Sequence, residues 1–378
     1  MGIEIREVKT KQELKTFIYL PAKIHTDHAN WVPPIYMDDK VFFNAKKNKS
    51  FTYCDTILLL AYKDDKCVGR IMGIINHRYN ELHDEKDGRF CFMETWNDQE
   101  VFDALISYVE NWAKKSGMEN LVGPLGFSDK DPQGFLIEGF NEPMVIAANC
   151  NFPYMPLLLE KEGYEKKVDC IVLKVDIPKV IPEIYLKISD RVMSRGKINM
   201  LEFTKRSELK PLIRPIFKLL NETFKDIYAF DPFEISEMDD FANRYLLLMD
   251  PKFIKVITNK QDEVIAFFIA MPDISKGIVA SKGKIIPFGI FQIFRAQKKT
   301  KQLNLLLGGV RKDYQGMGID VVMGVKMFET AIKRGMEYID THLQLETNHK
   351  MNAEFKFMGK EIYKRFRIYK KELNQKTN

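Results

Sequence analysis

The turn at residues 311–318 is the stretch of this sequence best suited to bind a phosphorylated ligand. A strand pattern over 303–310 runs into it, and a helix pattern over 319–333 follows at once. A glycine-containing turn in this position directs several backbone N–H groups at one spot, and the positive end of the helix dipole adds to them. The Gly-Lys-Ser/Thr of a P-loop is missing, and Val321 stands where a dinucleotide fingerprint needs its third glycine. The turn therefore predicts a phosphate site of another class.

The turn resembles the pyrophosphate loop of the GCN5-related N-acetyltransferases, written Gln/Arg-x-x-Gly-x-Gly/Ala. Residues 315–319 match the loop, whereas Asp320 stands where Gly or Ala is usual. The resemblance implies that acetyl-CoA or another acyl-CoA binds here. The negative charge of Asp320 disfavours a diphosphate, so its side chain is expected either to point away from the ligand or to weaken binding. A plain strand-to-helix turn is the alternative, and Asn348 could equally serve as a helix N-cap. The implied cofactor contacts are Leu307, Gly308, Gly309, Val310, Arg311, Lys312, Gln315, Gly316, Met317, Gly318, Ile319 and Asn348.

Acyl transfer to an amine needs a base for the amine, polarisation of the thioester and a proton for the leaving thiolate. The resemblance implies a tyrosine acid in the last helix, but Phe355 occupies its place. His342, Gln344 and Glu346 alternate along one predicted strand and so share a face. We take Glu346, Tyr363 and His342 as the catalytic candidates, with Glu346 as the base. Pocket or core lining is the alternative for His342, and a buried tyrosine with a bonded hydroxyl is the alternative for Tyr363.

An internal repeat indicates how the chain is organised. The segments 57–75 and 253–271 both read as strand, polar turn and strand, and Val68 and Val264 within them are 196 positions apart. Helix-like runs end near Gly163 and Gly359, which are also 196 positions apart. Two distant matches at one offset indicate a duplicated fold. We expect one domain at 1–177, a linker at 178–198 and a second domain at 199–378.

The order of strands and helices predicts an α/β protein of the α+β type, with a mixed, mostly antiparallel sheet flanked by helices. This order is similar to two acetyltransferase-type domains in tandem. The whole chain resembles a bacterial family of tandem acetyltransferase-type proteins with generally unassigned substrates. The segments that carry this likeness are 30–34, 138–140, 346–348 and 367–369.

The first half lacks a phosphate loop. The segment that follows its strand at 89–94 contains no glycine, and Asp98 and Glu100 would repel a pyrophosphate. We therefore expect a degenerate domain that shapes the acceptor side of a cleft between the two halves.

Composition narrows the class of protein. A hydrophobic content of 45%, a charged content of 29% and a net charge of +6 are typical of a soluble globular protein. No apolar run approaches the roughly 20 residues of a membrane span, and we expect no nucleic-acid partner. Five scattered cysteines indicate reduced thiols and a cytoplasmic location. His25 and His28 lack a third ligand, so no metal site is expected. The apolar segment 285–294 is expected to pack on the core or to cover the thioester.

These observations favour an acyl-CoA-dependent N-acyltransferase that acts on a primary amine of a small molecule or peptide. Direct attack by the amine is expected, because all five cysteines precede residue 171 and none lies in the second half. Two alternatives stay open: an aminoacyl-tRNA-dependent transferase of the peptidoglycan-bridge type, and a non-catalytic CoA-binding or sensor protein.

Overall fold

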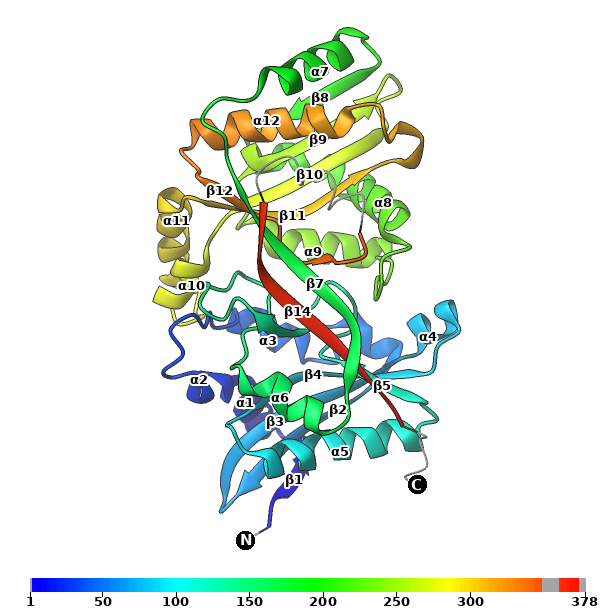
Figure 1. Ribbon diagram of the computed structural model, residues 1–378, viewed down its shortest axis with the longest axis vertical. Coiled ribbons are helices and arrows are strands. Elements are labelled where there is room, and N and C mark those ends of the chain that lie inside the picture. The colour runs from blue at the N-terminus through cyan, green and yellow to red at the C-terminus, as the bar shows by residue number, and fades with distance from the viewer. Residues whose placement is uncertain (1, 349–359, 374–378) are drawn as a thin grey trace.

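A single mixed sheet with helices on its faces runs the length of the molecule (Figure 1). The computed structural model describes residues 2–348 and 360–373. The first half contributes the strands β1 (Glu4–Glu7), β2 (Cys54–Lys63), β3 (Lys66–Asn76), β4 (Asp87–Thr95), β5 (Asn120–Gly123), β6 (Phe135–Glu138) and β7 (Glu165–Asp176). Its helices are α1 (Lys11–Tyr19), α2 (Pro21–Ile24), α3 (Tyr36–Phe42), α4 (His77–His83), α5 (Gln99–Lys115) and α6 (Tyr154–Lys161).

The second half repeats this plan with longer insertions. Its strands are β8 (Ile198–Glu202), β9 (Ile254–Asn259), β10 (Val264–Pro272), β11 (Gln302–Val310), β12 (Tyr338–Asp340), β13 (Gln344–Leu345) and β14 (Lys360–Glu372). Its helices are α7 (Glu183–Ser194), α8 (Ile213–Phe224), α9 (Ile235–Leu246), α10 (Ser275–Ala280), α11 (Gly289–Lys299) and α12 (Ile319–Lys333). Within the described ranges, no helix is both long enough and apolar enough to cross a membrane.

The two halves exchange a strand. The sheet order is β1-β2-β3-β4-β5-β14-β7-β12-β11-β10-β9-β8. Strand β14, from the end of the chain, therefore lies between β5 and β7 of the first half, and β7 pairs in turn with β12 of the second (Figure 1). The division at 178–198 stays a prediction, and the structure adds that neither half completes its sheet without a strand from the other.

Apolar spacing explains why the helices lie where they do. In α5 the buried side chains recur every three or four residues, which places them on one face against β3, and Asp98 caps the first turn. Helix α12 begins at Ile319 and ends at Lys333, as the sequence predicts. It packs on the sheet through Ile319, Val322 and Met323.

Several predicted elements differ from the structure. The strand expected near 144–149 does not form, and β6 pairs with β14 instead. The helix expected over 11–24 divides at Pro21, because proline lacks the N–H that a continuous helix needs. The strand expected over 338–346 splits into β12 and β13, because His342 has a left-handed φ of 56°. The last helix, expected over 349–358 with Phe355, lies outside the described residues.

The exchanged strand predicts that both halves unfold together. Trp31, Trp96 and Trp112, the three tryptophans, all lie in the first half, so their fluorescence reports on that half alone. We expect guanidinium unfolding curves from tryptophan fluorescence and from far-ultraviolet circular dichroism to coincide. A fluorescence transition well separated from the dichroism transition would contradict this coupling.

Candidate functional site

The sheet forks in the second half where β11 and β12 part. These parallel strands pair only at Gln302–Tyr338, Leu303–Ile339 and Asn304–Asp340. Beyond Asn304, the β12-side edge of β11 has no strand partner among the described residues. The first half forks in the same way, since β4 and β5 pair only over residues 87–89 and 120–122. The open edge of β11 offers backbone N–H and C=O groups to an extended ligand.

The open edge is shaped by a bulge and by two glycines. On its other side β11 pairs with β10, and the register shifts so that Leu306 is the extra residue. A bulge re-aims the backbone locally. A Cβ on Gly309 would lie 2.8 Å from Thr223 Oγ1 of α8, so this glycine lets the helix approach the strand. A Cβ on Gly308 would lie 2.8 Å from Phe268, so packing also accounts for this residue.

The turn after β11 presents open backbone amides. Gly318 is the N-cap of α12 in a left-handed conformation, and no side chain caps the helix. The N–H groups of Gly316, Met317 and Gly318 have no hydrogen-bond acceptor within residues 2–348 and 360–373. A Cβ on Gly316 would meet nothing within 4 Å. The space beside these amides can therefore admit an anion.

The equivalent turn of the first half is closed. Asp98 caps α5 by accepting a hydrogen bond of 3.2 Å from the Val101 N–H. The same carboxylate lies 3.0 Å from Lys63 Nζ. A negative charge thus already occupies this helix start, which would exclude a diphosphate.

Charged side chains around the open turn are partly neutralised. The Arg311 guanidinium lies 2.9 Å from Asp313 and 3.2 Å from Glu263, and the hydrogen bond to Asp313 raises its pKa. Lys312 is exposed and forms no ion pair with the described residues. Asp320 lies in the first turn of α12, and its side chain makes no hydrogen bond or ion pair with any residue that the structure describes. Because Arg311 is already paired with two carboxylates, Lys312 is the cation of this turn that is free to attract an incoming anion.

Asp340 is the hub of a buried polar cluster at the base of the fork. Its side chain is fully buried, and it accepts hydrogen bonds from Tyr363 Oη and, at 3.3 Å, from Lys364 Nζ. Lys364 Nζ also lies 3.1 Å from Tyr363 Oη. Burial, followed by the Asp340 charge, raises the pKa of Tyr363, so the phenol stays protonated and its proton is engaged by Asp340. Sequence reasoning found Tyr363 but missed Asp340 and Lys364, whose only signal was a charged residue inside a strand pattern.

His342 lies beside this cluster. Its backbone N–H donates to Asp340 Oδ1 at 2.7 Å, which helps to hold its left-handed conformation. Its Nε2 lies 3.3 Å from the Ile146 carbonyl oxygen, so Nε2 is the protonated nitrogen and Nδ1 carries the lone pair. Burial lowers the pKa of His342 below its ordinary value of 6.5. A neutral imidazole with an available lone pair can act as a base.

Glu346 has a different environment from the one predicted. The break at His342 means that His342, Gln344 and Glu346 do not alternate along one strand, and that prediction is wrong. Glu346 lies 2.7 Å from Lys166 Nζ and accepts a hydrogen bond of 3.2 Å from the Asp169 N–H. These contacts engage its carboxylate with a cation and a backbone donor, and its predicted role as the base stays untested.

Two other predicted positions bear on the site. Gln315 donates from Nε2 to the Val310 carbonyl at 3.0 Å, which ties the turn to the end of β11. Asn348 is exposed and donates its backbone N–H to the Leu345 carbonyl at 3.0 Å. The helix that Asn348 was expected to begin lies outside the described residues.

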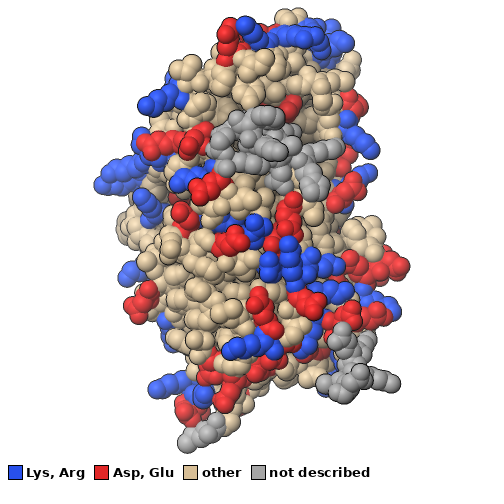
Figure 2. All heavy atoms as spheres, viewed as in Figure 1, with Lys and Arg blue, Asp and Glu red and all other residues tan. Residues whose placement is uncertain are grey.

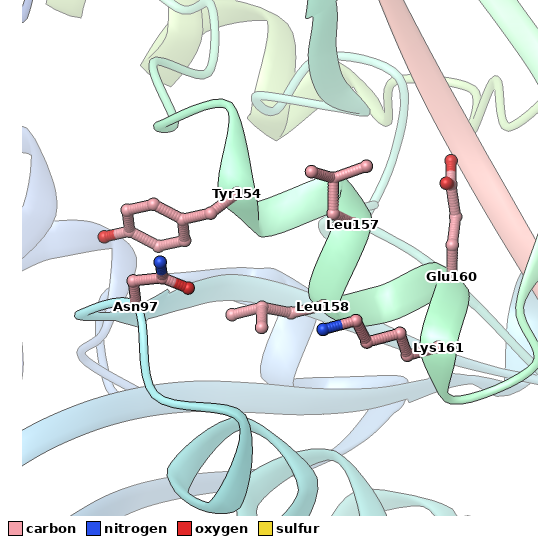
Figure 3. A pocket seen from close by; sticks show the side chains of 6 residues that line it. All are labelled: Asn97, Tyr154, Leu157, Leu158, Glu160 and Lys161. Carbon is pink, nitrogen blue, oxygen red and sulfur yellow. The ribbon is translucent and has the colours of Figure 1, made fainter.

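The first half keeps an open pocket of about 530 Å³ between the start of α5 and α6 (Figure 3). Tyr154 Oη donates to the Thr95 carbonyl at 2.9 Å, and Asn97 lies below the Tyr154 ring in Figure 3. Glu160 and Lys161 both line this pocket, so its lining carries one charge of each sign. The lining residues are Asn97, Tyr154, Leu157, Leu158, Glu160 and Lys161.

Comparison with known proteins identifies the fold. The chain is 27% identical over 381 residues to protein YghO of Escherichia coli (strain K12), covering 98% of this chain and 95% of that protein. It is also 27% identical over 378 residues to the bacterial ceramide synthase of Caulobacter vibrioides (strain NA1000 / CB15N), covering 98% of both proteins. No protein-family model matches the chain.

Solved structures match nearly the whole chain. A tandem GNAT protein from the clavulanic acid biosynthesis pathway superposes with a TM-score of 0.56 and 10% identity, covering 99% of this chain and 100% of that one. A GCN5-related N-acetyltransferase from Sphaerobacter thermophilus gives a TM-score of 0.52 and 11% identity, with coverages of 98% and 96%. The chain thus has the tandem GCN5-related N-acetyltransferase fold, and the fold class predicted from the sequence is confirmed.

Proposed function

We propose that this protein is an acyl-CoA-dependent N-acyltransferase whose acceptor is the primary amine of a lipid. One observation carries the acyl-CoA part of the proposal: the unpaired edge of β11 leads directly into an uncapped helix start, while the equivalent helix start in the first half is capped by Asp98. An extended chain that ends in a diphosphate fits this combination of open edge and open amides.

The residues present fit a bound acyl-CoA. Gly316 leaves beside the turn a space that a side chain would fill, and the amides of residues 316–318 face no described acceptor. The backbone of Leu305–Val310 would hold the extended arm, and Lys312 would add positive charge near the diphosphate. When bound, acyl-CoA supplies an activated thioester carbonyl.

The residues at the fork would carry out the proton transfers of the reaction. A bond forms between the amine nitrogen and the acyl carbon, the carbon–sulfur bond breaks, and the thiolate must gain a proton. His342 would take the amine proton at Nδ1 and could return it to the leaving thiolate. Asp340 would act as a positioning residue, because it holds the His342 backbone, Tyr363 and Lys364 at once.

A lipid amine is favoured over a peptide or polar amine for two reasons. A relative of nearly equal length is named a bacterial ceramide synthase, and a ceramide is the amide of a fatty acid and a long-chain amino alcohol. In addition, Leu306 at the bulge belongs to an apolar cluster with Ile274, Ile278 and Ile293. Such a wall suits hydrocarbon chains better than a polar acceptor. The same wall favours a long acyl group over acetyl.

The test is amide formation from defined reactants. The purified full chain would be incubated with a long-chain amino alcohol and with acyl-CoA donors whose acyl chains have two to eighteen carbons. The amide product would be followed by mass spectrometry and the released CoA thiol by a colorimetric assay. We expect amide and thiol in equal amounts with the long acyl donors. Binding of acyl-CoA without turnover over lipid, polar and peptide amines would instead favour a sensor. Transfer from aminoacyl-tRNA alone would favour the bridge-type alternative.

The charge of Asp320 allows a test of the proposed diphosphate site at residues 316–318. Its carboxylate lies in the first turn of α12, close to where a diphosphate of like charge would sit. We expect Asp320→Asn to bind acyl-CoA about three- to tenfold more tightly at low salt. The reason is that repulsion between the Asp320 carboxylate and a nearby diphosphate should cost about 1 kcal/mol of binding free energy. The gain should shrink at high salt. Calorimetric titration measures it, and unchanged affinity at low salt would place the diphosphate elsewhere.

A further inference from the structure

The segment 274–301 carries a surface that the proposed reaction does not use. It holds seven basic residues and no Asp or Glu, although the whole chain has a net charge of only +6. Six of the seven are exposed and form no ion pair with described residues, while Lys301 lies 3.5 Å from Glu337. The six are Lys276, Lys282, Lys284, Arg295, Lys298 and Lys299. Figure 2 shows Lys and Arg side chains at the edge where α11 lies in Figure 1.

Large apolar side chains project from the same segment. Ile286, Phe288 and Phe291 are 66%, 74% and 67% exposed, and Val279 is 47% exposed. Ile286 and Phe288 lie in the connection between α10 and α11, and Phe291 lies in the first turn of α11. Such a group of exposed aromatic and aliphatic side chains is unusual on a surface that has no partner.

The segment is firmly seated, so these side chains are not exposed because it is loosely packed. Helices α10 and α11 cross closely, since a Cβ on Gly277 would lie 2.6 Å from Ile293 Cα. Gln297 Nε2 donates to the Leu248 carbonyl at 2.5 Å, and the Tyr36 N–H donates to the Gly283 carbonyl at 3.1 Å. Ile285, Ile290 and Ile293 therefore pack on the core. Phe288 and Phe291 face solvent, so the segment 285–294 packs on the core only in part.

We propose that this surface, formed by α10, α11 and their connection, docks the protein on an anionic lipid bilayer. Exposed aromatic and aliphatic side chains insert at the boundary between headgroups and acyl chains, and surrounding Lys and Arg side chains attract anionic headgroups. An ordinary solvated helix carries charges of both signs, whereas the segment 274–301 has no carboxylate. Its charge is therefore complementary to an anionic surface. This proposal rests on the surface alone and does not require the proposed acceptor.

Docking here would place the fork near the membrane. The apolar cluster beneath α11 contains Leu306, the bulge residue on the open edge of β11. One packed apolar layer, which includes Ile278 and Ile293, would then separate the bilayer from the open edge of β11.

Co-sedimentation of the full chain with vesicles tests the proposal. We expect binding to phosphatidylcholine vesicles with one quarter phosphatidylglycerol to be at least about tenfold stronger than to phosphatidylcholine alone, and to weaken with salt. The double variant F288S/F291S and the double variant K298E/K299E should each lower binding at least about tenfold. Both should keep the wild-type melting temperature, because the replaced side chains are exposed.

Matched variants away from this surface serve as controls. Leu82 of α4 is 63% exposed, and Lys114 and Lys115 end α5, so L82S and K114E/K115E make similar changes elsewhere. They should bind vesicles like the wild type. No binding to either vesicle, or equal losses in the controls, would overturn the proposal. Vesicle-independent self-association that F288S/F291S abolishes would assign the surface to a second copy instead. If membrane docking fails but the proposed function holds, acyl-CoA should still raise the melting temperature, equally in the wild type and in F288S/F291S. Loss of that thermal shift in the wild type would instead mark failure of the proposed function.

Discussion

Replacing Gly316 with valine should abolish the rise in melting temperature that we expect acyl-CoA to give the wild-type protein. A ligand at about one hundred times its dissociation constant stabilises the native state by about 2.7 kcal/mol, which for a chain of this size is a shift of several degrees. The valine side chain would fill the space in which Gly316 now meets nothing within 4 Å. The amides beside it could then no longer approach a diphosphate. Thermal denaturation with millimolar long-chain acyl-CoA measures the shift.

The control for this variant must carry the same backbone strain. Gly316 has a φ of 74°, in the left-handed region that valine disfavours. Gly117, after α5, has a φ of 82° and likewise nothing within 4 Å of an added Cβ. Gly117→Val should lower the melting temperature without ligand by a similar amount and keep the ligand-induced shift. A full ligand-induced shift in Gly316→Val would contradict the proposed diphosphate site at residues 316–318. Loss of this shift in both variants would show only general destabilisation.

The sequence predicted the parts of the fold that depend on local pattern. Helix α12 and the hairpins β2–β3 and β9–β10 have strong periodicity and clear turns, so their positions follow from the residues alone. The turn at 315–319 could also be located, because a glycine N-cap between a strand and a helix is a local feature.

Long-range pairing could not be predicted from pattern. Nothing within Lys360–Glu372 tells that this strand inserts between β5 and β7, because any half-buried strand pattern fits several neighbours. The same holds for Asp340, which became important only when β14 brought Tyr363 and Lys364 to it. The left-handed His342 was hidden as well, since an alternating polar pattern reads as a continuous strand. The catalytic assignment therefore depends on contacts between segments far apart in the chain.

His342→Gln is expected to lower kcat by about 10²- to 10⁴-fold, the usual contribution of a positioned general base. Glutamine can still donate to the Ile146 carbonyl as His342 Nε2 does, but it cannot take a proton from the amine. Because burial lowers the pKa of His342, the neutral form persists as the pH falls through 6.5. The wild-type enzyme should therefore keep full activity at pH 6.5 and lose it only below, with an acid limb that the variant lacks. Rates of thiol release from pH 5 to 8 measure both effects.

Glu346→Gln decides between the two candidate bases. Glu346 is held by Lys166 at 2.7 Å, so its replacement should cost stability and less than about tenfold in kcat. A sharp loss of kcat in Glu346→Gln with near-normal activity in His342→Gln would return the base to Glu346. The acyl-CoA thermal shift must persist in both variants, because neither residue belongs to the turn that we propose holds the diphosphate. Under that condition, loss of turnover in His342→Gln reports a missing proton acceptor rather than a missing donor substrate.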